Sequence, residues 1–253
     1  MHIALCFVFS IGTQAQNNAL EKRNELKLFS GIGTALVKDL TFSPLHYRAA
    51  TVAYALQYTR KFKRSKFILE LDFSNPTLQT QFSDFFETDF YTVNIELGFL
   101  RRMRGTDIFK AFTGVKLHSF TNLLFYDGTE SISFFAVQTL DLAFEAAFKL
   151  TTKSNFSSAI DIPVFGLLAR PAYTNWDVFI LENEDNPLRI LLRGDFTSLT
   201  NFFGLNWKTN YEYRISNPLA IQLQNTLRYY KTNSLRESRI VTNQLSLGLA
   251  FTF

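Results

Sequence analysis

The sequence has few of the residues on which several protein classes depend. Its 253 residues include one cysteine, Cys6, with six prolines and two tryptophans. One cysteine cannot build a disulfide framework or a cysteine-ligated metal site. The formal net charge is +4, and the lysines and arginines form no basic helix or recognition motif. Nucleic acid is therefore not an expected partner.

Long apolar runs are also missing, although the chain is rich in apolar residues. Hydrophobic residues make up 47% of the sequence and include 28 phenylalanines, yet the mean hydropathy is +0.00. No run approaches the roughly 18 apolar residues of a membrane-spanning helix. Apolar and polar residues instead alternate, as they do along the strands of a transmembrane β-barrel. A soluble β-sandwich or lipocalin-like barrel alternates too, so alternation alone leaves both classes open.

The first fifteen residues have the pattern of a secretory leader. A short apolar run from Ile3 to Ile11 precedes Thr13 and Ala15, which have the spacing that a signal peptidase accepts. We therefore predict a signal peptide over residues 1–15 and one β-barrel domain over residues 16–253. No lysine or arginine precedes the apolar run, and a buried N-terminal strand is the alternative interpretation. Cys6 lies in the leader, so the mature chain would contain no thiol.

From Leu26 onward, strand-length segments divide into an apolar and a polar face. In the segment 50–59, Val52, Tyr54 and Leu56 alternate with Thr51 and other small or polar residues. The polar faces of several segments carry charges, which favours an ionic interior and an apolar exterior in contact with lipid. The sequence thus predicts an all-β fold, a closed antiparallel up-and-down transmembrane β-barrel of about ten strands. An extra hairpin around residues 179–181 and 189–192 would make about twelve.

The predicted connections alternate in length. Short turns are expected near residues 60–65, 101–106, 151–155 and 216–218, and longer connections near 38–46, 75–88, 120–131, 169–200 and 231–238. Bacterial barrels have short periplasmic turns and longer outer loops. This alternation therefore assigns the short turns to the periplasmic side.

The last eight residues, SLGLAFTF, follow a recognisable pattern. Ser246 is followed by Gly248, and the aromatic residues Phe251 and Phe253 close the chain. This ending resembles the terminal targeting signal of outer-membrane β-barrels of Gram-negative bacteria, without indicating a particular family. The resemblance implies location in the outer membrane, contact with its lipid and lipopolysaccharide, and insertion by the barrel-assembly machinery.

The polar faces place charges of both signs in the predicted lumen. We expect a lumen charge network of Glu70, Asp72, Glu96, Lys116, Asp141, Glu145, Asp161, Lys208, Glu212 and Arg228. Mixed charges in a narrow barrel most simply form a hydrogen-bonded plug. The alternative is a narrow path for ions or small solutes lined by these charges.

A catalytic site is not expected. Beyond His2 in the leader, the histidines are His46, expected in a loop, and His118. His118 and Ser119 are adjacent in a predicted strand, so they point to opposite faces and cannot act as base and nucleophile. No spacing indicates a metal or cofactor site.

Basic residues cluster at two neighbouring short turns. The predicted periplasmic basic rim consists of Arg60, Lys61, Lys63, Arg64, Lys66, Arg101, Arg102 and Arg104. These side chains are either solvated charges that contact lipid phosphates or a docking surface for an acidic periplasmic protein. We therefore expect a small outer-membrane protein with a structural role or a role as accessory subunit of an envelope complex. A narrow passive channel is the second hypothesis, and an outer-membrane enzyme the third.

Overall fold

The computed structural model describes residues 24–41, 43–80, 88–126, 132–170, 182–183, 185–186, 189, 192–234 and 236–253. The predicted signal peptide lies outside these residues. The strands are β1 (Asn24–Asp39), β2 (Ser43–Lys61), β3 (Ser65–Ser74), β4 (Thr77–Leu78), β5 (Thr88–Gly105), β6 (Phe109–Tyr126), β7 (Ile132–Lys149), β8 (Ser154–Ala169), β9 (Asp195–Ser198), β10 (Phe202–Arg214), β11 (Leu219–Thr232) and β12 (Ser238–Thr252).

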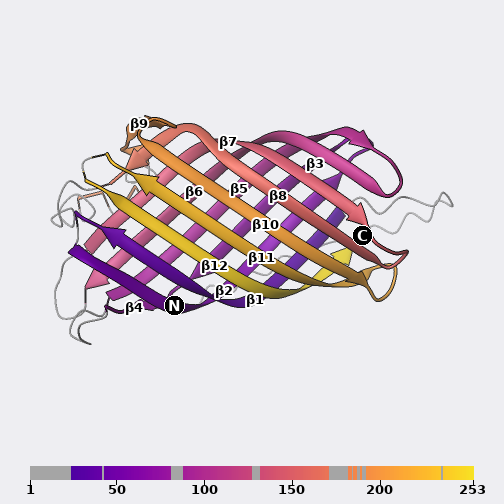
Figure 1. Ribbon diagram of the computed structural model, residues 1–253, viewed down its shortest axis with the longest axis horizontal. Coiled ribbons are helices and arrows are strands. Elements are labelled where there is room, and N and C mark those ends of the chain that lie inside the picture. The colour runs from indigo at the N-terminus through magenta and orange to yellow at the C-terminus, as the bar shows by residue number, and fades with distance from the viewer. Residues whose placement is uncertain are drawn as a thin grey trace.

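Ten of these strands form a closed barrel with antiparallel neighbours (Figure 1). The ladder between β1 and β12 closes the barrel and runs from Glu25 opposite Thr252 to Asp39 opposite Ser238. The short strands β4 and β9 lie outside this ring of ten and pair with β5 and β8. The predicted all-β barrel of about ten strands is confirmed.

The alternation along each strand separates the two surfaces of the wall. Val52, Tyr54 and Leu56 of β2 are exposed on the outside, whereas Thr51 and Ala53 between them are buried. The neighbouring strands alternate in the same way: their apolar side chains lie on the outer surface of the barrel, and their charged side chains lie in its lumen. An aqueous protein would have these two surfaces reversed, because burying apolar surface is what stabilises it. The apolar exterior is suited to lipid.

Aromatic side chains on the outer surface pair near the strand ends. Toward the end with long connections, Tyr91 contacts Phe125 at 5.5 Å between ring centroids, and Phe203 contacts Tyr229 at 5.9 Å. At the opposite end, Phe251 and Phe253 stack at 6.0 Å. Aromatic residues at both ends of the wall are typical of the interfacial girdles of membrane barrels.

The connections differ in part from the prediction. Residues 38–46 were expected to form a longer connection, which is wrong: β1 continues to Asp39 and β2 begins at Ser43. Pro44 suggested a loop, but it lies at the very start of β2, where the missing N–H breaks no ladder bond. His46 is consequently an exposed residue of β2, paired with Lys38, and does not lie in a loop.

The expected hairpin within 169–200 is only partly within the described residues. Residues 179–181 lie outside them, and neither Arg189 nor Leu192 belongs to a strand. A short strand follows instead at β9, which pairs with the end of β8. Among the described residues, no helix is both long and apolar enough to cross a membrane.

Strands β8 and β10 are hydrogen-bonded over only part of their length. Hydrogen-bonded pairing between them ends at Asp161 opposite Asn206, and from Phe165 onward β8 pairs with β9. Pro163 lies in this interval and has no N–H to donate. A Cβ atom on Gly204 would lie 2.6 Å from Cγ of Pro163, so only glycine permits the two strands to approach here. Packing of Pro163 against Gly204 closes the wall where hydrogen bonds do not.

Arg170 joins three segments at the end of the barrel with long connections. Its guanidinium donates to the Asp39 carboxylate, to Oγ1 of Thr41 at 2.7 Å, and to the backbone oxygens of Ser234 and Arg236. At the same end, the hydrogen bond and charge of Lys38 lower the pKa of the half-buried Glu237 carboxyl. The turn after β1, the end of β8 and the connection between β11 and β12 are thereby held together.

Candidate functional site

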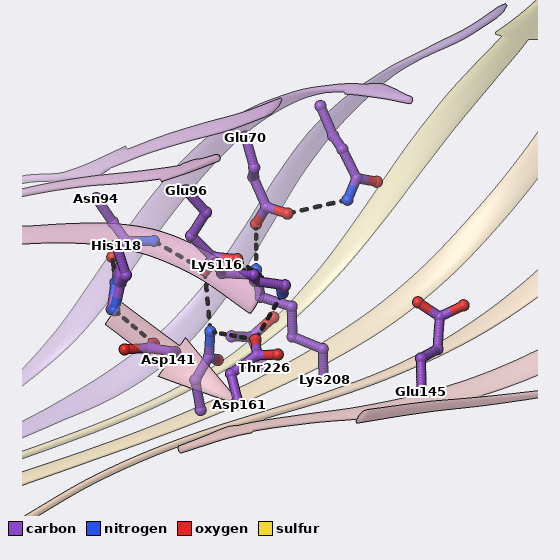
Figure 2. A network of polar contacts seen from close by, with 12 residues as sticks. Glu70, Asn94, Glu96, Lys116, His118, Asp141, Glu145, Asp161, Lys208 and Thr226 are labelled. Carbon is purple, nitrogen blue, oxygen red and sulfur yellow. Dashed lines mark hydrogen bonds and ion pairs between the residues drawn. The ribbon is translucent and has the colours of Figure 1, made fainter. Parts of the chain in front are cut away.

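A buried ionic network fills the middle of the lumen (Figure 2). Glu96 of β5 lies at its centre. Its Oε1 accepts hydrogen bonds from Nζ of Lys208 at 2.7 Å and Nδ2 of Asn206 at 2.9 Å, and its Oε2 accepts one from Nζ of Lys116 at 3.1 Å. Lys116 also donates to Oδ2 of Asp161 at 2.6 Å, and Lys208 donates to Oε1 of Glu70 at 2.7 Å. Each lysine is therefore held between two carboxylates from different strands.

The network continues toward the end with long connections. Asp72 accepts hydrogen bonds from the Arg228 guanidinium and from Nδ2 of Asn94 at 2.9 Å. Oδ1 of Asn94 contacts Nε2 of His118, whose Nδ1 lies 3.3 Å from Oδ2 of Asp141. Charge-assisted hydrogen bonds of this kind are stronger than neutral ones and fix the geometry of the groups that they join. The central network therefore ties together seven strands, namely β3, β5, β6, β7, β8, β10 and β11.

Eight of the ten predicted lumen residues belong to this central network: Glu70, Asp72, Glu96, Lys116, Asp141, Asp161, Lys208 and Arg228. The other two lie nearer the short turns. Glu145 pairs with Lys66, and Glu212 accepts hydrogen bonds from Asn155 at 3.0 Å and Gln222 at 2.9 Å. In Figure 2, Glu145 stands apart from the central group.

Sequence reasoning missed other members of the network, among them Asn94, His118, Asn206 and Gln57, which donates to Oε2 of Glu70 at 3.0 Å. All four follow the inward parity of their strands, which was the available signal. His118 is buried and contacts Asn94, Asp141 and, at 3.5 Å, the hydroxyl of Tyr230. The sequence alone could not show whether an inward histidine has hydrogen-bond partners, because the carboxylate, amide and phenol groups around it come from other strands.

An apolar layer blocks the lumen beyond the network, and the sequence did not predict it. Phe120 and Tyr230 lie at its centre with ring centroids 4.3 Å apart, and Phe202 stacks on Tyr230 at 6.1 Å. The layer consists of Ala35, Val37, Tyr47, Leu78, Phe90, Phe120, Leu124, Phe135, Val137, Leu168, Phe202, Tyr230 and Ile240. The expected polar filling of the lumen therefore does not extend to this end. Inward positions there carry aromatic and aliphatic residues, which pack against one another instead of binding water.

The opposite half of the lumen is hollow. A cavity of about 1210 Å³ begins at the central network, where Glu70, Lys116 and Lys208 form its floor, and reaches the turn residues Lys63 and Asn217. We call this cavity the vestibule. Small inward residues, among them Ala147, Ser157, Ala159 and Ala220, leave this space open. A ten-stranded barrel was expected to be largely filled by side chains, and this half is not.

The predicted basic rim divides into two sets. Lys61, Lys63, Arg64, Lys66 and Arg102 line the vestibule. Arg60, Arg101 and Arg104 are exposed and do not line it; Arg60 lies over the ring of Phe62, 5.4 Å from its centroid. The two groups therefore face different surroundings, the lumen and the outside of the wall.

The residues of the predicted targeting signal lie on β12 at the closure of the barrel. Gly248 faces the lumen opposite Phe29 of β1, and a Cβ atom on it would lie 2.3 Å from the Phe29 ring. Ser246 also faces inward, whereas Phe251 is exposed on the outer surface beside Phe253. An aromatic ring packed over a glycine on the neighbouring strand is a known device for fixing register.

Within the described ranges, no group of three or more histidine, cysteine, aspartate or glutamate side chains is placed to hold a metal ion. The carboxylates of the network are occupied by lysine, arginine and amide donors instead.

The wall and the lumen together define the class of protein. Ten antiparallel strands close on themselves, the outer surface is apolar with aromatic ends, and the charges are enclosed. A closed barrel satisfies every backbone hydrogen bond internally, which a spanning sheet needs in lipid. This chain is an integral β-barrel protein of the Gram-negative outer membrane.

The comparisons with known proteins name no family. No protein-family model matches the chain, and no curated protein sequence matches it. Among solved structures, it is similar to the outer membrane protease OmpT of Escherichia coli, with 7% identity, a TM-score of 0.44 and coverage of 96% of this chain and 100% of that one. It is also similar to Neisserial surface protein A, with 10% identity, a TM-score of 0.39 and coverage of 90% and 97%. A third similar structure is the toluene transporter TodX of Pseudomonas putida, with 9% identity, a TM-score of 0.35 and coverage of 91% and 89%.

Proposed function

We propose that this protein is a non-conducting outer-membrane barrel that serves as a structural or accessory subunit of an envelope complex. The observation that carries the proposal is the double closure of the lumen. The ionic network spans the cross-section from β3 and β5 to β8 and β10, and the apolar layer covers it on one side. An ion would have to displace paired charges and then cross a layer of packed rings.

The accessory role is supported by the basic residues at the short-turn end. In bacterial barrels this end faces the periplasm, and it presents cations both inside the vestibule and outside the wall. A periplasmic protein with an acidic surface would be attracted to it. The buried contacts of His118 with Asn94, Asp141 and Tyr230 also favour a structural over an enzymatic role for the one inward histidine among the described residues.

Planar-bilayer recording of the purified full chain tests the closure. We expect no sustained open-channel current under conditions in which a porin in the same lipid conducts. A steady current would favour the second candidate, a narrow passive channel, which the hollow vestibule supports because it already opens half of the lumen to water.

Affinity purification in mild detergent tests the accessory role. We expect a periplasmic or membrane protein to co-purify in constant ratio to the tagged barrel at low salt and to dissociate at high salt, because salt screens exposed charges. Recovery of the barrel alone at low salt would contradict the accessory role.

A further inference from the structure

The vestibule differs from the central network in its charge balance. Its lining includes six cations that take part in no ion pair among the described residues: Lys63, Arg64, Arg102, Lys110, Lys149 and Arg214. The remaining lining cations, such as Lys61 with Glu25 and Lys66 with Glu145, are paired. The lining carboxylates outside ion pairs are Asp107 and Glu212. The cavity therefore has an excess of free positive charge.

The free cations surround the cavity instead of converging on one point. Lys63 and Arg64 come from the turn after β2, Arg102 from β5, Lys110 from β6, Lys149 from β7 and Arg214 from β10. A single phosphate is bound by donors that converge within hydrogen-bond distance of it. Donors spread around a wall match several separate anionic groups, as along an acidic peptide.

The position of these cations argues against a lipid ligand. Lipid headgroups lie outside the wall, where the outward set Arg60, Arg101 and Arg104 is exposed to them. The vestibule cations face the lumen, which headgroups in the bilayer plane do not enter. A cavity lined by cations and surrounded by low-dielectric protein and lipid also concentrates the electrostatic field, which attracts anions from solution.

We infer that the vestibule is a binding site for an acidic peptide segment of a periplasmic protein, inserted between the free cations on β5, β6, β7 and β10. This inference rests on the proposed accessory role and specifies it. The segment enters the barrel, and the inward cations, not the whole rim, recognise it. The cavity of about 1210 Å³ has room for a few extended residues, and the central network closes it below, so the segment docks and does not pass through.

Binding of a fluorescent hexaglutamate peptide to the purified full-length barrel tests the inference. We expect saturable binding that weakens as salt rises. The triple variant K110A/K149A/R214A should lower the affinity roughly tenfold, since each exposed pair contributes a few-fold. The matched control R60A/R101A/R104A removes the same number of charges from the outside of the wall and should retain the affinity of the natural chain.

A labelling experiment locates the peptide. Ala147 lines the vestibule, whereas Met103 is 69% exposed and does not line it. In variants that carry A147C or M103C in place of the single natural cysteine, hexaglutamate should slow maleimide labelling of A147C and leave M103C unchanged. Protection of both positions, or of neither, would contradict insertion.

Besides that labelling result, three outcomes would overturn the inference. These are no binding of hexaglutamate, equal loss of affinity in the inward and outward triple variants, or competition by inorganic phosphate or phosphatidylglycerol vesicles at equal anion concentration. The last would make the phosphate group the ligand. Failure of the proposed function is separate, because it would appear as bilayer current or as purification of the barrel alone, neither of which depends on peptide binding.

Discussion

The two halves of the lumen lie within one barrel but are filled differently. Toward the long connections, buried apolar side chains pack together, with the rings of Phe120 and Tyr230 4.3 Å apart between centroids. Toward the short turns, inward alanines and serines leave a cavity of about 1210 Å³. Strand number sets the width of a barrel, but the size of the inward side chains decides whether that width is open. One half of this protein is therefore built for stability and the other for access.

The largest effect is expected where the two halves meet, at Glu96. Its side chain is 1% exposed and accepts hydrogen bonds from Lys116, Lys208 and Asn206. Glu96→Ala would remove one of the two carboxylates that hold each of two buried lysines, leaving Lys116 with Asp161 and Lys208 with Glu70, and removing one partner of a buried pair costs about 3–5 kcal/mol. We expect the urea midpoint of unfolding to fall accordingly, measured by the gel shift between folded and unfolded barrel.

Glu237→Ala is the matched control for Glu96→Ala. The Glu237 carboxylate also pairs with cations, Lys38 and Arg239, but its side chain is 27% exposed at the end of the barrel, against 1% for Glu96. Its removal should leave the urea midpoint almost unchanged. Equal shifts in the two variants would show that burial of the network contributes nothing to stability.

The next effect is expected in the apolar layer. Leu78 of β4 is 0% exposed and packs in the cluster that contains Phe90 and Phe120. Leu78→Ala would leave a cavity and cost about 2–4 kcal/mol. The variant should still fail to conduct in bilayers, because the ionic network below it remains intact. A destabilised variant that conducts would mean that the apolar layer alone closes the lumen.

A smaller effect is expected at the closure of the barrel. Gly248→Ala would place a methyl group against the Phe29 ring, and overpacking of this kind costs about 1–3 kcal/mol. The pair G248A/F29A should restore part of the loss, because the smaller side chain removes the clash. If F29A does not improve the variant, the backbone oxygen of Leu28, 2.9 Å from the added Cβ atom, and not the Phe29 ring is what requires glycine at position 248.

The sequence allowed prediction of the wall better than of the lumen. Alternation in segments such as 50–59 identifies the outward face because lipid accepts only apolar side chains there, and the same parity placed Glu70, Asp72 and Glu96 inside. The apolar layer was not predicted because an apolar residue such as Phe120 can pack either against lipid on the outer face or against other side chains in the lumen. The start of β2 near Pro44 was also not predictable, because it depends on the register between β1 and β2. The division of the basic rim into inward and outward side chains depends on the residue at which each strand ends.

The smallest stability effect is expected in the vestibule, and it is the sharpest test of the difference between the two halves. Lys149 and Arg214 are exposed and take part in no ion pair among the described residues. The variant K149A/R214A should therefore change the free energy of unfolding by no more than about 0.5 kcal/mol, as surface substitutions usually do. Urea unfolding measures this change, with Glu96→Ala as the reference for a large shift. Charged side chains that line a cavity without stabilising the fold are expected at a ligand-binding site. A marked loss of stability in K149A/R214A would instead make the vestibule cations part of the fold, and the hollow half of the barrel would lose its distinction from the filled one.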